Sequence, residues 1–180
     1  MNRRIFLRSA AALTSAAIAP EAFATRSLSS SSDKELHLYN IHTGEFVKTT
    51  FKQAGQYDQD SLAELDHLLR DHRSGESTLI SRTLFNDIYA LQQMFKPNQA
   101  IEIISGYRSP KTNEQLRASG HGVAKRSLHM QGKAVDICIP GINLRQVRQA
   151  ALALKSGGVG YYPKSGFIHL DVGRVRQWGK

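Results

Sequence analysis

The sequence predicts an α+β fold, in which a mainly antiparallel sheet is flanked by helices. Two stretches of alternating apolar and polar residues open the folded region, and two stretches with apolar residues at helical spacing follow them. Further strands then alternate with helices, and the chain ends in a hairpin. At 180 residues the chain is long enough for one domain with its own core, which we expect to span residues 35–180.

The first half of this domain is expected to contain two strands and two helices. Residues 35–40 and 45–51 have the composition of strands, and turn residues at 42–44 lie between them. We expect one helix from residues 58–61 to about residue 72 and another at residues 81–95. Four leucines form the apolar stripe of the first helix: Leu62, Leu65, Leu68 and Leu69.

The second half is expected to contain four strands and two helices. The expected strands cover residues 100–105, 133–139, 159–162 and 166–172. The expected helices cover residues 110–118 and 143–155, and Asn143 is a suitable N-cap for the second. The last two strands form the terminal hairpin, because only a short Pro-Lys-Ser turn separates them.

Residues 1–24 have the features of a bacterial export signal. An arginine pair at positions 3 and 4, followed by an alanine-rich apolar run, resembles a twin-arginine signal. An Ala-x-Ala pattern predicts cleavage after Ala24, and residues 25–34 are expected to form a flexible, Ser-rich segment. We therefore expect a periplasmic protein without stable membrane insertion after cleavage. The alternative is an uncleaved membrane anchor.

The charge of the chain indicates an anionic partner outside the cytoplasm. Removing residues 1–24 takes away three arginines and one glutamate, which lowers the net charge from +9 to +7. Cell wall polymers are such a partner, whereas the scattered basic residues lack the aromatic interleaving of a nucleic-acid surface. Cys138 is the only cysteine, so no intramolecular disulfide is expected, and we interpret it as a small buried residue. We expect a monomer that does not bind nucleic acid.

Two histidines and one aspartate are candidate metal ligands. His129 lies in an expected loop just before the strand at 133–139, where Asp136 falls on the face opposite the aliphatic residues. His169 and Asp171 share one face of the strand at 166–172. Two imidazoles and one carboxylate suit Zn²⁺ with an open fourth position for water, the arrangement of a hydrolase.

Three short motifs together resemble the M15 zinc peptidases. They are Ser105-Gly-Tyr-Arg108-Ser109, Ser127-x-His129-x-x-Gly-x-Ala-x-Asp136 and Phe167-Ile-His169-x-Asp171, in this order. The resemblance is to the murein endopeptidase K branch, and it covers nearly the whole mature chain. It implies the M15 (LAS/Hedgehog-like) zinc peptidase architecture. It also implies an endopeptidase that hydrolyses the peptide cross-links of peptidoglycan for cell-wall growth or remodelling.

The resemblance also implies roles for individual residues. His129, Asp136 and His169 become the zinc ligands. Arg108 becomes the residue that orients the substrate carbonyl and stabilises the developing oxyanion. A guanidinium at the exit of a strand, with no competing acid nearby in the sequence, fits that role.

One position departs from the family pattern. Many M15 relatives carry a catalytic acid three residues before the last histidine ligand, where this chain has Gly166. Asp171 is the nearest replacement as the general base, or it only orients a ligand, and both roles stay open. His121 is a third candidate. The identity of the base is therefore not decided by the sequence.

Two other functions remain open alternatives. A carboxypeptidase that trims a terminal D-amino acid would need a basic residue for the free carboxylate, such as Lys125 or Arg126. A non-catalytic, zinc-containing wall-binding protein would be consistent with the glycine at position 166. Four aromatic residues are candidates for the floor of a peptide groove, although simple packing explains them equally well: Tyr107, Tyr161, Tyr162 and Trp178.

Overall fold

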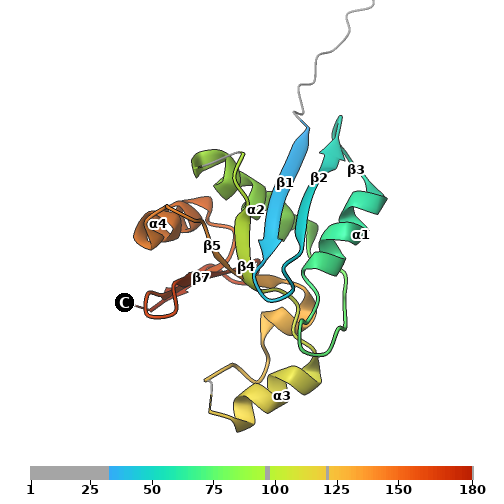
Figure 1. Cartoon of the computed structure of the whole chain (residues 1–180). Coiled ribbons are helices and arrows are strands. Elements are labelled where there is room, and N and C mark those ends of the chain that lie inside the picture. The colour runs from blue at the N-terminus through green and yellow to red at the C-terminus, as the bar shows by residue number, and fades with distance from the viewer. Residues whose placement is uncertain (1–32, 96–97, 121, 180) are drawn as a thin grey trace, which may run out of the picture.

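One sheet organises the protein, as the computed structural model shows (Figure 1). The structure describes residues 33–95, 98–120 and 122–179. Within these ranges, eight strands lie in the order β3-β2-β1-β4-β5-β7-β6-β8. The expected signal peptide, most of the Ser-rich segment and His121 lie outside the described residues.

The elements follow the sequence closely, with few differences at their ends. The strands are β1 (Lys34–Asn40), β2 (Phe46–Gln53), β3 (Gln56–Tyr57), β4 (Ile101–Ser105), β5 (Ala134–Cys138), β6 (Gly158–Tyr162), β7 (Phe167–Asp171) and β8 (Arg176–Trp178). The helices are α1 (Gln59–Leu68), α2 (Arg82–Phe95), α3 (Pro110–Ala118), α4 (Leu144–Leu154) and the 3₁₀ turn η1 (Leu128–Gln131). The sequence missed β3 and β8, because two or three residues are too few to display alternation.

The α+β class is confirmed, but the expectation of a mainly antiparallel sheet requires correction, because the sheet is mixed. β1 pairs in parallel with β4, and β6 pairs in parallel with β8. The first parallel pair arises because β2, β3, α1 and α2 intervene before the chain returns beside β1. The second arises because β8 reverses direction after β7 but lies on the far side of β6.

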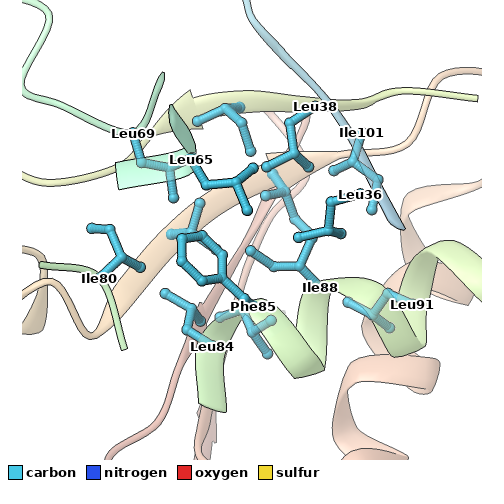
Figure 2. Packing of buried hydrophobic residues seen from close by; sticks show 14 of the residues in the cluster. Leu36, Leu38, Leu65, Leu69, Ile80, Leu84, Phe85, Ile88, Leu91 and Ile101 are labelled. Atoms are coloured by element: carbon cyan, nitrogen blue, oxygen red, sulfur yellow. The ribbon is translucent and has the colours of Figure 1, made fainter. Parts of the chain in front are cut away.

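The helices bury an apolar core against this sheet. α1 contacts β2, α2 contacts β1, and α4 contacts both β6 and β7. Figure 2 shows Phe85 and Ile88 of α2 packed with Leu36 and Leu38 of β1, all of them fully buried. Within the described residues, no helix combines the length and the apolar composition that a membrane span requires.

The register of five strands aligns a row of residues across the sheet. Ser105 of β4 pairs with Asp136 of β5, which pairs with His169 of β7. His169 pairs with Gly160 of β6, which pairs with Trp178 of β8. We call these five residues the site row. Its neighbours along β5 and β7 are aliphatic and belong to the core: Val135, Ile137, Ile168 and Leu170. The alternation predicted from the sequence for these two strands is thereby confirmed.

The helix α1 ends earlier than expected. Its last residue is Leu68, and Leu69 is its C-cap, whereas the sequence predicted an end near residue 72. The chain instead turns back on itself: the N–H of Gly75 donates to the carbonyl of Asp71 at 2.7 Å. This early end frees the segment after the helix to contact the turn that follows β4.

Candidate active site

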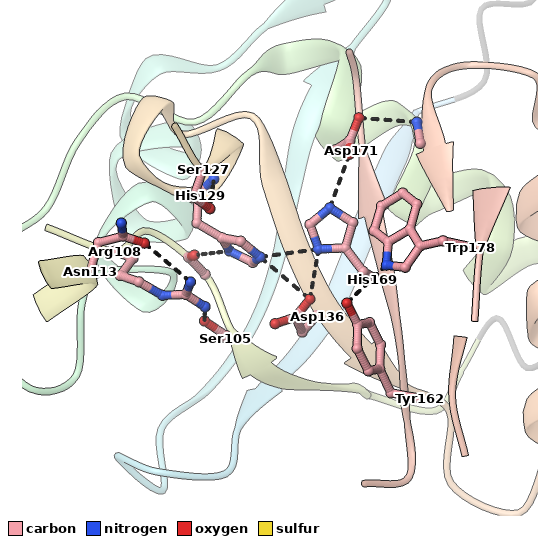
Figure 3. A network of polar contacts seen from close by, with 12 residues as sticks. Ser105, Arg108, Asn113, Ser127, His129, Asp136, Tyr162, His169, Asp171 and Trp178 are labelled. Carbon is pink, nitrogen blue, oxygen red and sulfur yellow. Dashed lines mark hydrogen bonds and ion pairs between the residues drawn. The ribbon is translucent and has the colours of Figure 1, made fainter. Parts of the chain in front are cut away.

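Side chains from η1, β5 and β7 converge on one point (Figure 3). His129 Nε2 lies 3.1 Å from His169 Nδ1, and Asp136 Oδ1 lies 2.9 Å from His169 Nδ1. The distance from His129 Nε2 to Asp136 Oδ1 is 3.4 Å. The expected loop around His129 is a 3₁₀ turn capped by Ser127, whose hydroxyl accepts from the His129 N–H. The three residues predicted as ligands therefore lie together.

The outer nitrogens of both imidazoles have acceptors as partners. His129 Nδ1 donates to the carbonyl oxygen of Gly106 at 2.7 Å, and His169 Nε2 donates to Asp171 Oδ2 at 3.0 Å. A neutral imidazole that donates from one nitrogen presents a lone pair on the other. Two lone pairs and one carboxylate oxygen thus face one another. This donor set fits a metal ion, which would relieve the repulsion among three acceptors.

The pKa values at this cluster reflect burial and the interactions among its side chains. Burial raises the pKa of Asp136, but His129 and His169 oppose burial and hold that pKa well below its usual range. Burial lowers the pKa of His169, but the bonds to Asp136 and Asp171 outweigh burial and raise it overall. A cation bound among these three side chains would displace any proton held there.

Asp171 is fully buried and has a partner for each carboxylate oxygen. Its Oδ1 accepts from the N–H groups of Gly158 and Gly173 at 3.0 and 2.9 Å. The guanidinium of Arg176 spans both oxygens, at 3.0 and 2.7 Å. Burial raises the pKa of Asp171, but hydrogen bonds from His169, Arg176 and the two backbone groups keep it well below its usual range.

Arg176 was missed by the sequence analysis. It lies on the short strand β8, five residues after Asp171, and an Arg-x-Trp run ending at Trp178 marks the place. Its guanidinium also stacks on the Trp178 ring, 4.9 Å from the centroid. Arg176 therefore joins β8 to the carboxylate behind His169.

Arg108 is buried beside the cluster without a carboxylate partner. Its two terminal nitrogens make long hydrogen bonds of 3.5 Å to Asn113 Oδ1 and Ser105 Oγ. Its Nε is buried and has no hydrogen-bond partner, and within the described residues no acid forms an ion pair with it. Burial lowers the pKa of the Arg108 guanidinium, and the charge of Asp136 partly opposes this. The donors of Arg108 are thus poorly satisfied by the protein.

The turn that carries Arg108 is anchored by the segment after α1. The Tyr107 N–H donates to the Leu69 carbonyl at 2.7 Å, and the Ser109 N–H donates to Asp71 Oδ2 at 2.9 Å. Asp71 also accepts from the Arg73 N–H at 3.0 Å. The sequence analysis missed Asp71, because no local pattern connects it with residues nearly forty positions away.

One cavity of about 530 Å³ contains the cluster, Arg108 and Asp171. Arg126 and Arg176 line it, as do three aromatic residues, Tyr162, Phe167 and Trp178. The remaining lining residues belong to the segment 122–128, which follows α3. The cavity is therefore cationic and aromatic around a compact group of acceptors.

The sequence candidates outside the cluster have different locations. Arg126 lines the cavity, whereas Lys125 is exposed and is not among the lining residues. Tyr161 points into the core and Tyr107 packs partly against it. Cys138 is half-buried and donates to Glu102 Oε2 at 3.0 Å, and burial together with that carboxylate raises its pKa to about 12. It is thus unsuited to act as a thiolate.

Gly166 lies in the turn between β6 and β7. Its φ of +77° is in the left-handed region, which favours glycine and disfavours an acidic side chain. Its N–H donates to the Tyr162 carbonyl at 2.9 Å and closes the turn. The departure from the family pattern thus coincides with a tight hairpin.

Two histidines, one aspartate and an arginine without a carboxylate partner in one cavity are the residue types expected of a metal-dependent hydrolase. The M15 peptidase family whose model is described as peptidoglycan L,D-endopeptidase MepK matches residues 28–178. The chain is 45% identical over 178 residues to the peptidoglycan L,D-endopeptidase MepK of Escherichia coli (strain K12), covering 98% of this chain and 97% of the relative. It is 44% identical over 140 residues to the probable peptidoglycan L,D-endopeptidase MepK of Haemophilus influenzae, covering 77% and 75%.

The chain therefore belongs to the M15 peptidase family, in its MepK branch. This confirms the family predicted from the sequence. It also confirms that the protein is an enzyme, a hydrolase of the peptidase class.

Proposed function

We propose that this protein is a zinc-dependent murein endopeptidase that cleaves peptide cross-links of peptidoglycan. The observation that carries the proposal is the convergence of three acceptor atoms beside an unpaired, buried guanidinium in one cavity. Relatives that are named peptidoglycan L,D-endopeptidases and match nearly the whole chain support the substrate. The L,D description of those relatives favours a cross-link between an L and a D centre.

His129, Asp136 and His169 are the proposed zinc ligands. Catalytic zinc sites have three protein ligands and a fourth position for water or substrate, where the ion would acidify water and polarise a carbonyl. The Gly106 carbonyl and Asp171 hold the two imidazoles in the tautomers that present lone pairs to the metal. Asp136 supplies one negative charge, which reduces the charge of the site.

Arg108 is the proposed electrophilic partner of the reaction. Its buried donors make only long bonds within the protein, so a substrate carbonyl oxygen would be a better acceptor than either present partner. Charge develops on that oxygen in the transition state, and a preorganised guanidinium stabilises it most at that stage. We therefore assign Arg108 to orienting the carbonyl and stabilising the oxyanion.

Asp171 is proposed to act through His169, and its role as a base is the alternative. Both of its oxygens accept several hydrogen bonds, and its lowered pKa makes it a weak proton acceptor. A carboxylate behind a histidine ligand fixes the ring and raises its basicity. A proton acceptor for the attacking water would have to compete with Arg176 for Asp171.

A carboxypeptidase is the second candidate, and one observation favours it. Arg126 lines the cavity and forms no ion pair with another described residue, so it is available to a terminal carboxylate. The third candidate, a zinc-containing wall-binding protein without turnover, would leave the donors of Arg108 unused. Activity on defined substrates separates all three.

We further propose a periplasmic location and a monomeric state. Peptidoglycan lies outside the cytoplasm, and the basic balance of the chain suits residence on an anionic wall. Export by the twin-arginine route rests on residues 1–24 alone. Binding to isolated sacculi should weaken with added salt.

Digestion of purified sacculi by the mature protein tests this function. The digestion is run as purified, with chelator, and with chelator followed by zinc, and the released muropeptides are measured by mass. Loss of cross-linked dimers only in the presence of zinc supports the endopeptidase, and the dimers lost identify the bond. Shortening of monomers by one residue supports the carboxypeptidase. One bound zinc without any cleavage supports the wall-binding protein.

A further inference from the structure

The hydroxyl of Tyr162 accepts a hydrogen bond from a neighbouring donor, and its own O–H remains able to donate. Trp178 Nε1 donates to the Tyr162 oxygen at 2.9 Å. An indole N–H only donates, so the phenolic oxygen accepts this bond and its own O–H is left to donate. Within the described residues, no acceptor takes that proton. A hydroxyl of this kind, on the wall of a substrate cavity, is available to a ligand oxygen.

Two contacts fix the position of the Tyr162 ring and its hydroxyl. The ring stacks on Phe167, its partner across the β6–β7 ladder, with centroids 4.7 Å apart and planes 24° apart. The bond from Trp178 then restricts the rotation of the hydroxyl. Because two aromatic rings hold it, the donor is preorganised and loses little freedom when a substrate arrives.

Trp178 is itself fixed to the metal cluster through the site row. Gly160 lies between His169 and Trp178 in the register, and it has no side chain to separate them. A Cβ at Gly160 would come within 2.6 Å of the Trp178 ring, so the indole covers this glycine. The indole therefore lies against His169, with ring centroids 5.2 Å apart. The absence of a side chain at Gly160 thus allows Trp178 to contact His169.

Tyr162 and Arg108 flank the cluster from different elements. Figure 3 shows Arg108 on the side of His129 and Tyr162 on the side of Trp178, with Asp136 between them. A carbonyl oxygen directed into the cluster would therefore meet a guanidinium on one side and a phenol on the other.

We propose that Tyr162 is a second catalytic donor, whose hydroxyl hydrogen-bonds to the oxyanion that forms from the scissile carbonyl. The proposal rests on the proposed function and adds a residue to it. Tyr162 stays protonated throughout, so no bond to its hydrogen breaks. It acts by stabilising charge that exists only in the transition state. Arg108 supplies the charged donor and Tyr162 the neutral one.

Replacing Tyr162 by Phe removes the hydroxyl and preserves the ring. We expect kcat on a purified cross-linked muropeptide dimer to fall by about 10²-fold while KM changes little. A phosphinate analogue of the scissile bond, which carries the anionic oxygens of a tetrahedral intermediate, should lose affinity by a similar factor. Zinc content should remain as in the wild-type protein, because Tyr162 is not among the proposed ligands.

Two further variants make the test specific. Tyr161→Phe makes the same chemical change on the opposite face of β6, where the ring is buried in the core, and should leave kcat unchanged. Trp178→Phe removes the indole N–H that aims the phenol and should lower kcat by a smaller factor. Combined with Tyr162→Phe, it should add less than its own separate effect, because the two residues act as a unit.

The outcomes distinguish this inference from the proposed function. If the wild-type protein cleaves the dimer and Tyr162→Phe retains its kcat, the catalytic role of the hydroxyl is refuted while the endopeptidase stands. A raised KM with unchanged kcat would also overturn the proposal, because it would make Tyr162 a wall for binding only. If the wild-type protein itself cleaves no murein substrate, the proposed function fails first.

Discussion

The two faces of the sheet differ in composition although they share the same strands. On one face, Val135, Ile137, Ile168 and Leu170 pack under the helices as core. On the other face, Asp136, His169 and Asp171 alternate with them, where Asp136 and His169 are proposed metal ligands and Asp171 accepts from His169. The strands thus provide stability through one face and chemistry through the other. Rigid core packing fixes the backbone, and the backbone fixes the ligands.

Changes at two adjacent residues of β7, His169 and Leu170, should have the largest effects and test whether the two faces have separate roles. His169→Ala removes a proposed ligand and should lower murein hydrolysis by at least about 10³-fold, because Lewis acid and activated water are both lost. Stability measured in chelator should fall less than for a core residue, since the side chain lies outside the apolar core although it hydrogen-bonds Asp136 and Asp171. Initial rates on sacculi, zinc content and thermal unfolding in chelator measure these effects. Wild-type activity with zinc still bound would exclude His169 as a ligand.

Leu170→Ala changes the next residue along the strand and should lower stability while leaving catalysis unchanged. The side chain is 1% exposed, so its loss leaves a cavity and should cost about 2–5 kcal/mol of unfolding free energy. The folded fraction at 25 °C should keep its kcat and bind one zinc. Urea unfolding in chelator, together with rates normalised to the folded fraction, checks this. A large loss of kcat in fully folded Leu170→Ala would show that the two faces are not separable.

Asp171→Asn tests whether the supporting carboxylate belongs to the chemistry or to the geometry. An amide group would face the Arg176 guanidinium, so the hydrogen bond that orients His169 should weaken. Zinc affinity should therefore fall by about 10–100-fold. With zinc saturating, we expect much of kcat to return, with an unchanged pH–rate profile. Asp60→Asn, an exposed change in α1, is the matched control and should alter neither quantity.

The opposite result for Asp171→Asn would assign the base. If zinc stays bound at one equivalent while kcat falls by about 10³-fold or more, Asp171 accepts the proton directly. The pH–rate profile would then lose its acidic limb. Both roles stay within the network of His169 and Arg176.

Most of the fold followed from local pattern, whereas the support of the site did not. Period-two alternation correctly predicted the apolar face of β5 and β7, because each strand carries its own signal. The same alternation put His169 and Asp171 on one face. The contact between Asp171 and Arg176 requires β8 to pair with β6. The sequence of a three-residue strand is too short to predict which strand it pairs with. Register across five strands determines the site row, and only the folded sheet defines that register.

Asp71 is the most distant support of the site and should have the smallest effect when changed. Burial raises its pKa, but hydrogen bonds from Thr112, Ser109 and Arg73 outweigh burial and lower it to about 2 from an ordinary value of 3.8. Because the folded state lowers this pKa, the stabilisation is fully present above about pH 4 and is lost as the pH falls to about 2. The native protein should therefore lose this contribution in that acidic window.

Asp71→Asn should remove the pH dependence of stability that this carboxylate causes, and it should slightly shift the position of Arg108. The amide can replace only one acceptor oxygen, so a buried N–H of Ser109 or Arg73 loses its partner at a cost of about 1–3 kcal/mol. The stability difference from the wild-type protein should be largest near pH 5 and shrink towards pH 2, as measured by urea unfolding in chelator. We expect kcat to fall about tenfold, because the turn that carries Arg108 loses an anchor. A stability difference that is constant with pH would mean that Asp71 is not charged in the fold, and the anchoring would then have a different cause.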